Sequence, residues 1–157
     1  MSFDSTSPLN TDPNARVFSS SCFDFLLIEL VPMAERMAKE LATEGKETED
    51  EEVRETTFFR LESLGYRVGQ GLAERFARDR PRFTDNLDVI KFLCKDLWTV
   101  LFKKQVDNLK TNHRYLWFPC GIIRGALANL GINTTVQAET SDLPGATFQI
   151  KTLQPRP

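Results

Sequence analysis

The chain has 157 residues, of which 41% are hydrophobic and 27% charged, and its formal net charge at pH 7 is −2. This is the composition of an ordinary globular protein that is long enough to bury a core in one domain. The small net charge gives no general attraction to nucleic acid. No uninterrupted apolar stretch approaches the length of a membrane-spanning helix. We therefore expect a cytosolic domain.

The three cysteines are Cys22, Cys94 and Cys120. They are odd in number, far apart in the sequence and set among apolar residues, so they match neither a disulfide framework nor a CxxC metal site. We expect buried, reduced thiols. No cofactor or metal is implied.

A helix is expected after an N-terminal tail. Residues 1–20 are rich in Ser, Thr, Asn and Pro, which is typical of disorder, and residues 21–157 are predicted to form a single domain. Ser20 or Ser21 is a plausible cap for the helix, whose apolar residues recur at helical spacing. Pro32 predicts an irregularity after the second turn.

A second helix is predicted over about residues 53–77, after an acidic, solvated connection at 44–52. It contains Gly65, Gly69 and Gly71, although each interior glycine costs about 1 kcal/mol relative to alanine. Because Gly65 and Gly69 lie four residues apart on one helical face, they would let another backbone approach closely. A dinucleotide-binding loop or a membrane-helix dimer would need other surroundings, since a helical pattern with charged residues runs through these glycines. We predict close helix packing in a soluble fold.

Further helices are expected in the second half of the chain. Thr84 is predicted to cap a third helix with Asp85 in its first turn, and apolar residues around most of its circumference predict that it is buried centrally. Residues 105–113 could form a short strand. Another helix is expected from Pro119, with Gly131 at its C-terminal cap.

Two strands are predicted to complete the domain, joined by the turn sequence Leu143-Pro144-Gly145. Alternation along each segment predicts which residues share a face. In the first strand these are Ile132, Thr134, Val136 and Ala138. In the second strand they are Phe148, Ile150 and Thr152. The order helix, helix, helix, strand, helix, hairpin predicts an α+β domain.

Three long motifs carry a family resemblance: Leu64-Gly-Tyr-Arg-Val-Gly-Gln-Gly-Leu-Ala-Glu-Arg-Phe76, Leu87-Asp-Val-Ile-Lys-Phe-Leu-Cys-Lys-Asp-Leu-Trp98 with its continuation from Phe102 to His113, and Phe118-Pro-Cys-Gly-Ile-Ile-Arg-Gly-Ala-Leu127. In these motifs and in the order of its elements, the chain resembles the small-subunit family of the TRAPP vesicle-tethering complex. The similarity is greatest to the subunit-six branch. It covers roughly residues 22–153.

The resemblance implies an α/β plait, in which four helices pack on one face of a small antiparallel sheet. It also implies a non-enzymatic scaffold that forms a heterodimer with a related TRAPP small subunit inside the larger TRAPP assembly. That assembly exchanges nucleotide on a Rab-type GTPase in ER-to-Golgi and Golgi traffic. The implied location is cytoplasmic, with peripheral contact to ER and cis-Golgi membranes made only through the complex.

The chain departs from the family pattern in two places. Between His113 and Tyr115 it lacks a stretch that the family normally carries, comprising a strand, a turn and the beginning of the last long helix. We therefore expect a sheet that is short of a strand, with its central edge exposed. One family branch carries a lipid-modified cysteine just before the third helix, but residues 78–83 contain no cysteine, so acylation is not implied here.

The first two predicted helices carry apolar residues on more than one face, and a domain this small cannot cover them all. The candidate partner interface comprises Phe23, Leu27, Leu30, Met37, Leu61, Leu64, Leu72 and Phe76. A basic cluster at the bend after the second helix could contact anionic lipid head groups or simply be a solvated helix end, and it comprises Arg75, Arg78, Arg80 and Arg82.

Two rival hypotheses remain open. An acyl chain could bind between the helices and the sheet, beside an aromatic set that is more often plain core: Phe92, Trp98, Phe102, Trp117 and Phe118. An enzyme could use Cys120 as nucleophile and His113 as base, although no recognised nucleophile motif surrounds the cysteine. No catalytic, cofactor-binding or metal-ligating residue is predicted.

Overall fold

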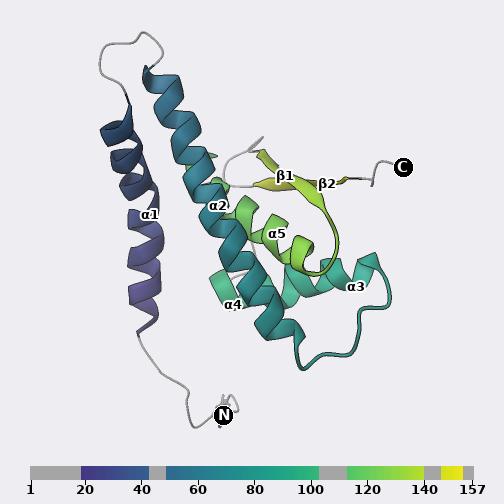
Figure 1. Cartoon of the computed structure of the whole chain (residues 1–157). Helices are drawn as coiled ribbons and strands as arrows, with labels where there is room; N and C mark the ends of the chain where they lie inside the picture. The colour runs from purple at the N-terminus through teal and green to yellow at the C-terminus, as the bar shows by residue number, and fades with distance from the viewer. Residues whose placement is uncertain (1–18, 43–48, 103–112, 140–145, 154–157) are drawn as a thin grey trace.

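The computed structural model describes residues 19–42, 49–102, 113–139 and 146–153. The predicted turn at 143–145 and nearly all of the predicted tail lie outside these ranges, as does the predicted strand at 105–113 apart from its last residue. The elements in chain order (Figure 1) are α1 (Ser20–Leu41), α2 (Glu49–Ala77), α3 (Asn86–Lys91), a π-helical segment (Phe92–Leu97), α4 (Trp98–Phe102), a 3₁₀ helix (His113–Leu116), α5 (Trp117–Asn129), β1 (Thr134–Glu139) and β2 (Thr147–Thr152).

Helix α1 lies along one side of α2, and α5 with the strands lies on the other side (Figure 1). Ser19 occupies the N-cap of α1 without a side-chain hydrogen bond, so the predicted cap at Ser20 or Ser21 is wrong by a residue. The helix also continues without interruption through Pro32, contrary to the predicted irregularity. Proline removes only the bond to the carbonyl of Ile28, a residue at an exposed position where water can replace that bond.

Helices α2 and α5 cross with their backbones in close contact. A Cβ added to Gly65 would lie 3.1 Å from Gly121 Cα and would overlap a carbonyl oxygen of α5, and one added to Gly69 would lie 2.8 Å from the carbonyl carbon of Ile122. Gly121 and Gly125 on α5 are equally crowded by α2. The two glycines of each helix thus face the backbone of the other, which is the close approach that absent Cβ atoms permit.

An ion pair accompanies this crossing. Arg124 on α5 donates from both Nε and Nη2 to the carboxylate of Glu62 on α2, with 2.7 Å between Nη2 and Oε2. The same guanidinium lies 4.3 Å from the ring centroid of Tyr66. Bidentate geometry and stacking are the contacts that favour arginine over lysine.

The third predicted helix is composed of α3, the π-helical segment and α4. Asp85 is its N-cap, accepting from Asp88 N at 2.8 Å, whereas Thr84 donates to the Asp88 carboxylate; the predicted cap is therefore wrong by one residue. The pKa of Asp88 is lowered by hydrogen bonds from the side chain and the backbone N–H of Thr84, and to a smaller extent by the positive charges of Lys91 and Arg80.

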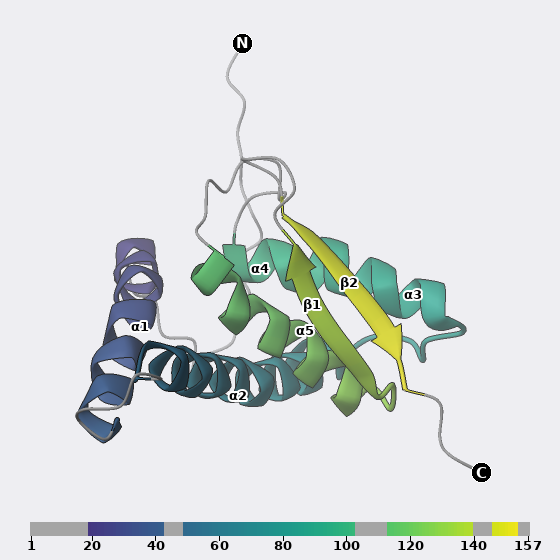
Figure 2. The same cartoon turned by 90° about the horizontal axis from the view of Figure 1, so that it is seen from above.

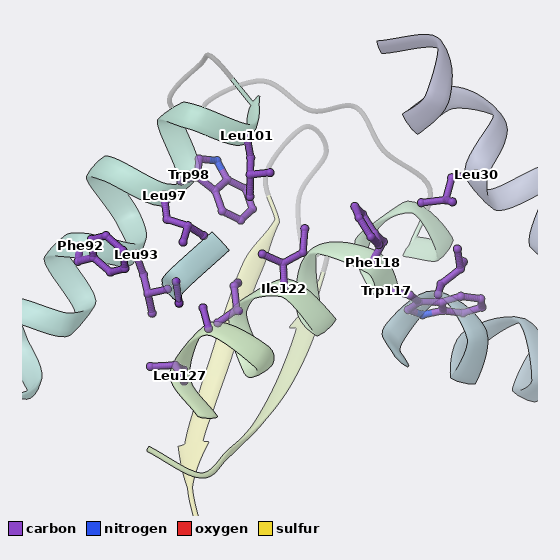
Figure 3. Packing of buried hydrophobic residues seen from close by; sticks show 14 of the residues in the cluster. Leu30, Phe92, Leu93, Leu97, Trp98, Leu101, Trp117, Phe118, Ile122 and Leu127 are labelled. Atoms are coloured by element: carbon purple, nitrogen blue, oxygen red, sulfur yellow. The ribbon is translucent and has the colours of Figure 1, made fainter. Parts of the chain in front are cut away.

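The prediction that this helix is buried all round is wrong. One face lies in the core through Phe92, Leu97 and Trp98, but Leu87 and Val100 are about half exposed. The elements that pack on this side of the helix include α2, α5 and the strands, and α5 and β2 are seen along one side of it in Figure 2. Figure 3 shows its core residues pointing toward Ile122 and Leu127 of α5.

The strands form a two-stranded antiparallel sheet in which Thr134 pairs with Thr152 and Ala138 with Phe148. Thr134 and Ala138, which were predicted to share one face of this strand, are both buried. Gly131 has φ +84° after the end of α5, as the predicted cap requires. Helices α3, α4 and α5 lie on one face of the sheet (Figure 1), and β1 lies nearer α2 than β2 does (Figure 2). The predicted α+β class is confirmed.

The cysteine prediction holds for one thiol only. Cys120 is buried, but Cys22 and Cys94 are exposed. Apolar neighbours in the sequence do not decide which side of a helix a residue occupies, because neighbours point in different directions around the helix axis.

Candidate functional site

An apolar groove runs between α1 and α2, beside the line along which the two helices pack. Its volume is about 530 Å³. We call it the α1–α2 groove, and it is lined by Leu30, Met33, Ala34, Met37, Thr56, Phe59, Arg60, Leu61, Ser63, Leu64 and Arg67.

The floor of the groove belongs to the core and its walls face solvent. Leu30 is 6% exposed and Leu61 is 1% exposed, whereas Met33, Met37 and Phe59 are 39%, 41% and 69% exposed. Large apolar side chains gathered around a concave surface are typical of a protein-binding site. The groove therefore offers a pre-formed surface on which a complementary apolar side chain could be buried.

Two arginines stand among these apolar residues. Arg60 and Arg67 both line the groove, and Arg60 Nε is buried without a hydrogen-bond partner in the described part of the chain. The two guanidinium groups carry positive charge, so the groove favours an occupant that is apolar at its centre and carries carboxylates at its margin.

The eight residues predicted for a partner interface fall into different environments. Leu30, Met37, Leu61 and Leu64 meet in the groove. The other four do not line it: Phe76 is exposed beyond it near the end of α2, and the remaining three pack partly buried against the core, namely Phe23, Leu27 and Leu72.

Met33 and Phe59 are not among the residues predicted from the sequence for this site. The sequence does contain an indication for Phe59, because this residue lies off the apolar stripe that begins at Leu61 and continues through Leu64. A large aromatic residue on an otherwise polar helical face is a candidate contact. What placed it beside Met37 of α1 was the tertiary packing of two helices, which the sequence alone does not give.

The basic cluster lies at the end of α2 and in the connection to α3. Its member Arg80 is engaged within the chain, pairing with Asp96 at 2.5 Å and lying 5.1 Å from the ring centroid of Phe92. This arginine connects the end of α2 to the π-helical segment. Lipid contact by Arg75, Arg78, Arg80 and Arg82 stays a prediction.

Comparison with known proteins identifies the family. The model of the transport protein particle (TRAPP) component family matches residues 23–115 and 113–153. The chain belongs to the TRAPP component family.

Named TRAPP relatives share much of the sequence. Trafficking protein particle complex subunit 6B of Mus musculus is 47% identical over 119 residues, covering 58% of this chain and 75% of the mouse protein. Subunit 6A of Homo sapiens is 41% identical over 118 residues, covering 57% and 74%. An uncharacterized protein of Schizosaccharomyces pombe is 35% identical over 158 residues, covering 82% of this chain and 61% of the yeast protein.

The TRAPP match is interrupted inside the chain. The two matched segments meet at residues 113–115, where the missing stretch was expected. The alignment with the mouse protein spans 119 positions but only 58% of this chain, about 91 residues, so about 28 positions of the relative have no counterpart here. In this TRAPP chain the 3₁₀ helix at His113–Leu116 leads directly into α5.

The aromatic set proposed for acyl-chain binding belongs to the core of this TRAPP domain. Phe92, Trp98, Trp117 and Phe118 are all buried, and Phe102 packs against them partly buried. The ring centroids of Trp98 and Phe102 are 4.5 Å apart, and those of Trp98 and Phe148 are 5.5 Å apart. Trp98, Phe102 and Phe148 pack against one another at this place, so the geometry there does not favour the ligand hypothesis.

The environment of Cys120 does not suit a nucleophile. Burial, with a smaller effect of the Glu62 carboxylate, raises the pKa of the Cys120 thiol to about 12. The thiol is therefore protonated near neutral pH, whereas nucleophilic attack needs the thiolate. The side chain of His113 lies outside the described part of the structure. Among the described residues there is no group of three potential metal ligands, and no described helix is long and apolar enough to cross a bilayer.

We expect the three thiols to differ in alkylation by iodoacetamide at pH 8. Cys22 and Cys94 are exposed and should react readily, whereas the raised pKa should slow Cys120 roughly a thousandfold relative to a thiol of pKa 9.0. Peptide mapping by mass spectrometry gives the three rates, and labelling in urea provides the control in which the thiols should react alike. Rapid native labelling of Cys120 would contradict this assignment.

Proposed function

We propose that this chain is a non-enzymatic scaffold subunit of a TRAPP-type vesicle-tethering complex, and that it forms a heterodimer with a related TRAPP small subunit through the α1–α2 groove. The observation that carries the proposal is the exposure of Met33, Met37 and Phe59 around the groove. The family membership and the names of the relatives, which are subunits of a trafficking protein particle complex, supply the class of partner.

The energetics of the groove support pairing. Burying one large apolar side chain contributes about 1.5–3 kcal/mol, so covering these three would be a substantial part of the free energy of a specific interface. Phe59 has the most exposed surface of the three, and an aromatic residue that becomes buried near the centre of an interface is typical of a binding hot spot. A carboxylate of the partner could pair with the guanidinium of Arg60 or Arg67, which both line the groove.

The role beyond pairing follows from the family. We propose that the heterodimer forms part of the larger TRAPP assembly, which acts in guanine-nucleotide exchange on a Rab-type GTPase in ER-to-Golgi and Golgi traffic. This chain would contribute surface rather than chemistry. It would reside in the cytoplasm and meet ER or cis-Golgi membranes peripherally, through the complex.

Co-purification from cells tests the proposal. We expect a tagged form of the full chain to recover another TRAPP small subunit in a one-to-one molar ratio, as measured by quantitative mass spectrometry. Native mass spectrometry of the same eluate separates the proposal from the acyl-chain alternative, because a bound lipid would appear as added mass on the monomer. Recovery of lipid-loaded monomer without any TRAPP subunit would overturn the proposed function.

A further inference from the structure

Strand β1 has one edge that no described strand covers. The sheet contains only β1 and β2 in the described part of the chain. Leu153 N donates to Asn133 O at 2.8 Å, which makes these opposed residues a hydrogen-bonded pair. Hydrogen-bonded and non-bonded pairs alternate along antiparallel strands. The backbone N–H and C=O groups of Thr134, Val136 and Ala138 therefore point away from β2.

A cleft lies along this free edge. Its volume is about 540 Å³, and we call it the β1-edge cleft. It separates β1 from the N-terminal half of α2, and α5 contributes to its wall. Figure 2 shows β1 on the side of the sheet that faces α2.

The lining of the cleft is apolar below the strand edge and mainly acidic around it. Phe58, which is 44% exposed, packs edge-on against Trp117 with 5.6 Å between ring centroids. Three carboxylates border the cleft, those of Glu51, Glu55 and Glu139, and there is one guanidinium among its lining residues, that of Arg54. The local charge therefore favours a basic occupant.

We propose that the β1-edge cleft binds an extended segment of another polypeptide, which adds a third strand to the sheet. Backbone hydrogen bonds to the free edge would provide affinity, as in other cases of strand addition. Alternate side chains of the segment would enter the apolar wall, and lysines or arginines between them would meet the carboxylates. This site is separate from the α1–α2 groove and does not depend on the function proposed for it.

The charge of the cleft favours a single basic segment as its occupant. Paired strands lie about 4.8 Å apart, so a strand added to β1 would lie in the β1-edge cleft, whose opposite wall is the N-terminal half of α2. The three carboxylates around it favour lysines or arginines in that segment. The interruption of the family match also lies at residues 113–115, just before Trp117 in the cleft wall.

Amide hydrogen exchange with a synthetic probe tests the proposal. The probe is a blocked hexapeptide of sequence Lys-Val-Thr-Val-Lys-Val, added to the full chain and followed by NMR. We expect Thr134, Val136 and Ala138 to exchange rapidly in the free chain and at least tenfold more slowly at saturating peptide. Thr135 and Gln137 should exchange slowly in both states, because their amides bond to β2.

Two altered peptides separate strand addition from general attraction. The same peptide with N-methyl groups on the residues whose N–H groups would face β1 cannot pair, and one with glutamate in place of lysine has the wrong charge. Both should bind at least tenfold more weakly. Slow exchange at the three edge amides in the free chain, whether at low or at high concentration, would show that the chain or a second copy already covers the edge, and the proposal would be overturned.

A backbone variant provides the matched test on the protein. Ala138→Pro removes an edge N–H and places a ring where the added strand would lie, while leaving the bonds to β2 intact. It should abolish peptide binding, and Thr135→Ala should not change it. Should the proline variant fail to fold, Glu139→Lys provides a second test. It is expected to lower the affinity for the lysine peptide at least fivefold and to raise the affinity for the glutamate peptide. Unchanged affinities in a folded variant would refute the site.

Discussion

Replacing Gly69 by alanine is expected to destabilise the fold by about 3 kcal/mol, or to prevent folding altogether. The new Cβ would lie 2.8 Å from the carbonyl carbon of Ile122 and 2.9 Å from its Cα. Overpacking commonly costs about 1–3 kcal/mol when side chains can rearrange. Here the obstacle is backbone, so α2 and α5 would have to separate along the crossing that joins the two halves of the core. The gain in helix propensity of about 1 kcal/mol offsets only part of this cost.

Gly71→Ala is the matched control for this prediction. Gly71 lies in the same helix two residues away, and a Cβ added to it meets nothing within 4 Å. The substitution should therefore stabilise the fold by up to about 1 kcal/mol. Urea denaturation followed by far-UV circular dichroism measures both variants. A Gly69→Ala protein within about 0.5 kcal/mol of the wild type would show that the two helices do not cross in backbone contact.

Phe59→Glu is expected to weaken binding to the sister TRAPP subunit at least a hundredfold, equivalent to about 2.8 kcal/mol. The phenylalanine ring is 69% exposed in the monomer, so the monomer should remain folded. In the proposed complex the substitution would remove an apolar contact and bring a carboxylate among the apolar side chains of the groove, where removing a charge from water is costly. Met37→Glu on the opposite wall should act in the same direction.

Phe25→Glu provides the control on the same pair of helices. Phe25 is 68% exposed on α1 but does not line the groove, so its replacement should change the affinity less than threefold. Leu30→Glu is a poor test, because Leu30 is 6% exposed and belongs to the core. This substitution would unfold the monomer, so a loss of binding would not report on the interface. Equal loss of binding in the Phe25 and Phe59 variants would argue against the groove as the contact site.

Local sequence patterns predicted those parts of the fold that depend on local geometry. The spacing of Gly65 and Gly69 predicted a face for close packing, and the alternation in Thr134–Glu139 predicted which residues share one face of the strand. Helix caps were displaced by one residue, since Asp85 and the neighbouring Thr84 both have side chains suited to the position. The exposure of Cys94 was missed because burial depends on which elements cover a helix.

The candidate site was less predictable because it is made by two helices together. Leu30 and Leu61 were predicted as interface residues because they lie on the apolar stripes of the first and second helices. In the structure they form the floor of the groove and are buried by the domain itself. The more exposed contact, Phe59, lies off that stripe. Periodicity identifies which residues share a face, and only the packing of α1 on α2 decides what remains uncovered.

The most direct test of the proposed pairing is sedimentation velocity of the purified chain, alone and mixed with each recombinant TRAPP small subunit in turn. The proposal predicts a one-to-one heterodimer with one of them, with dissociation promoted by Phe59→Glu and not by Phe25→Glu. A chain that sediments as a folded monomer at high concentration and in every mixture would contradict it.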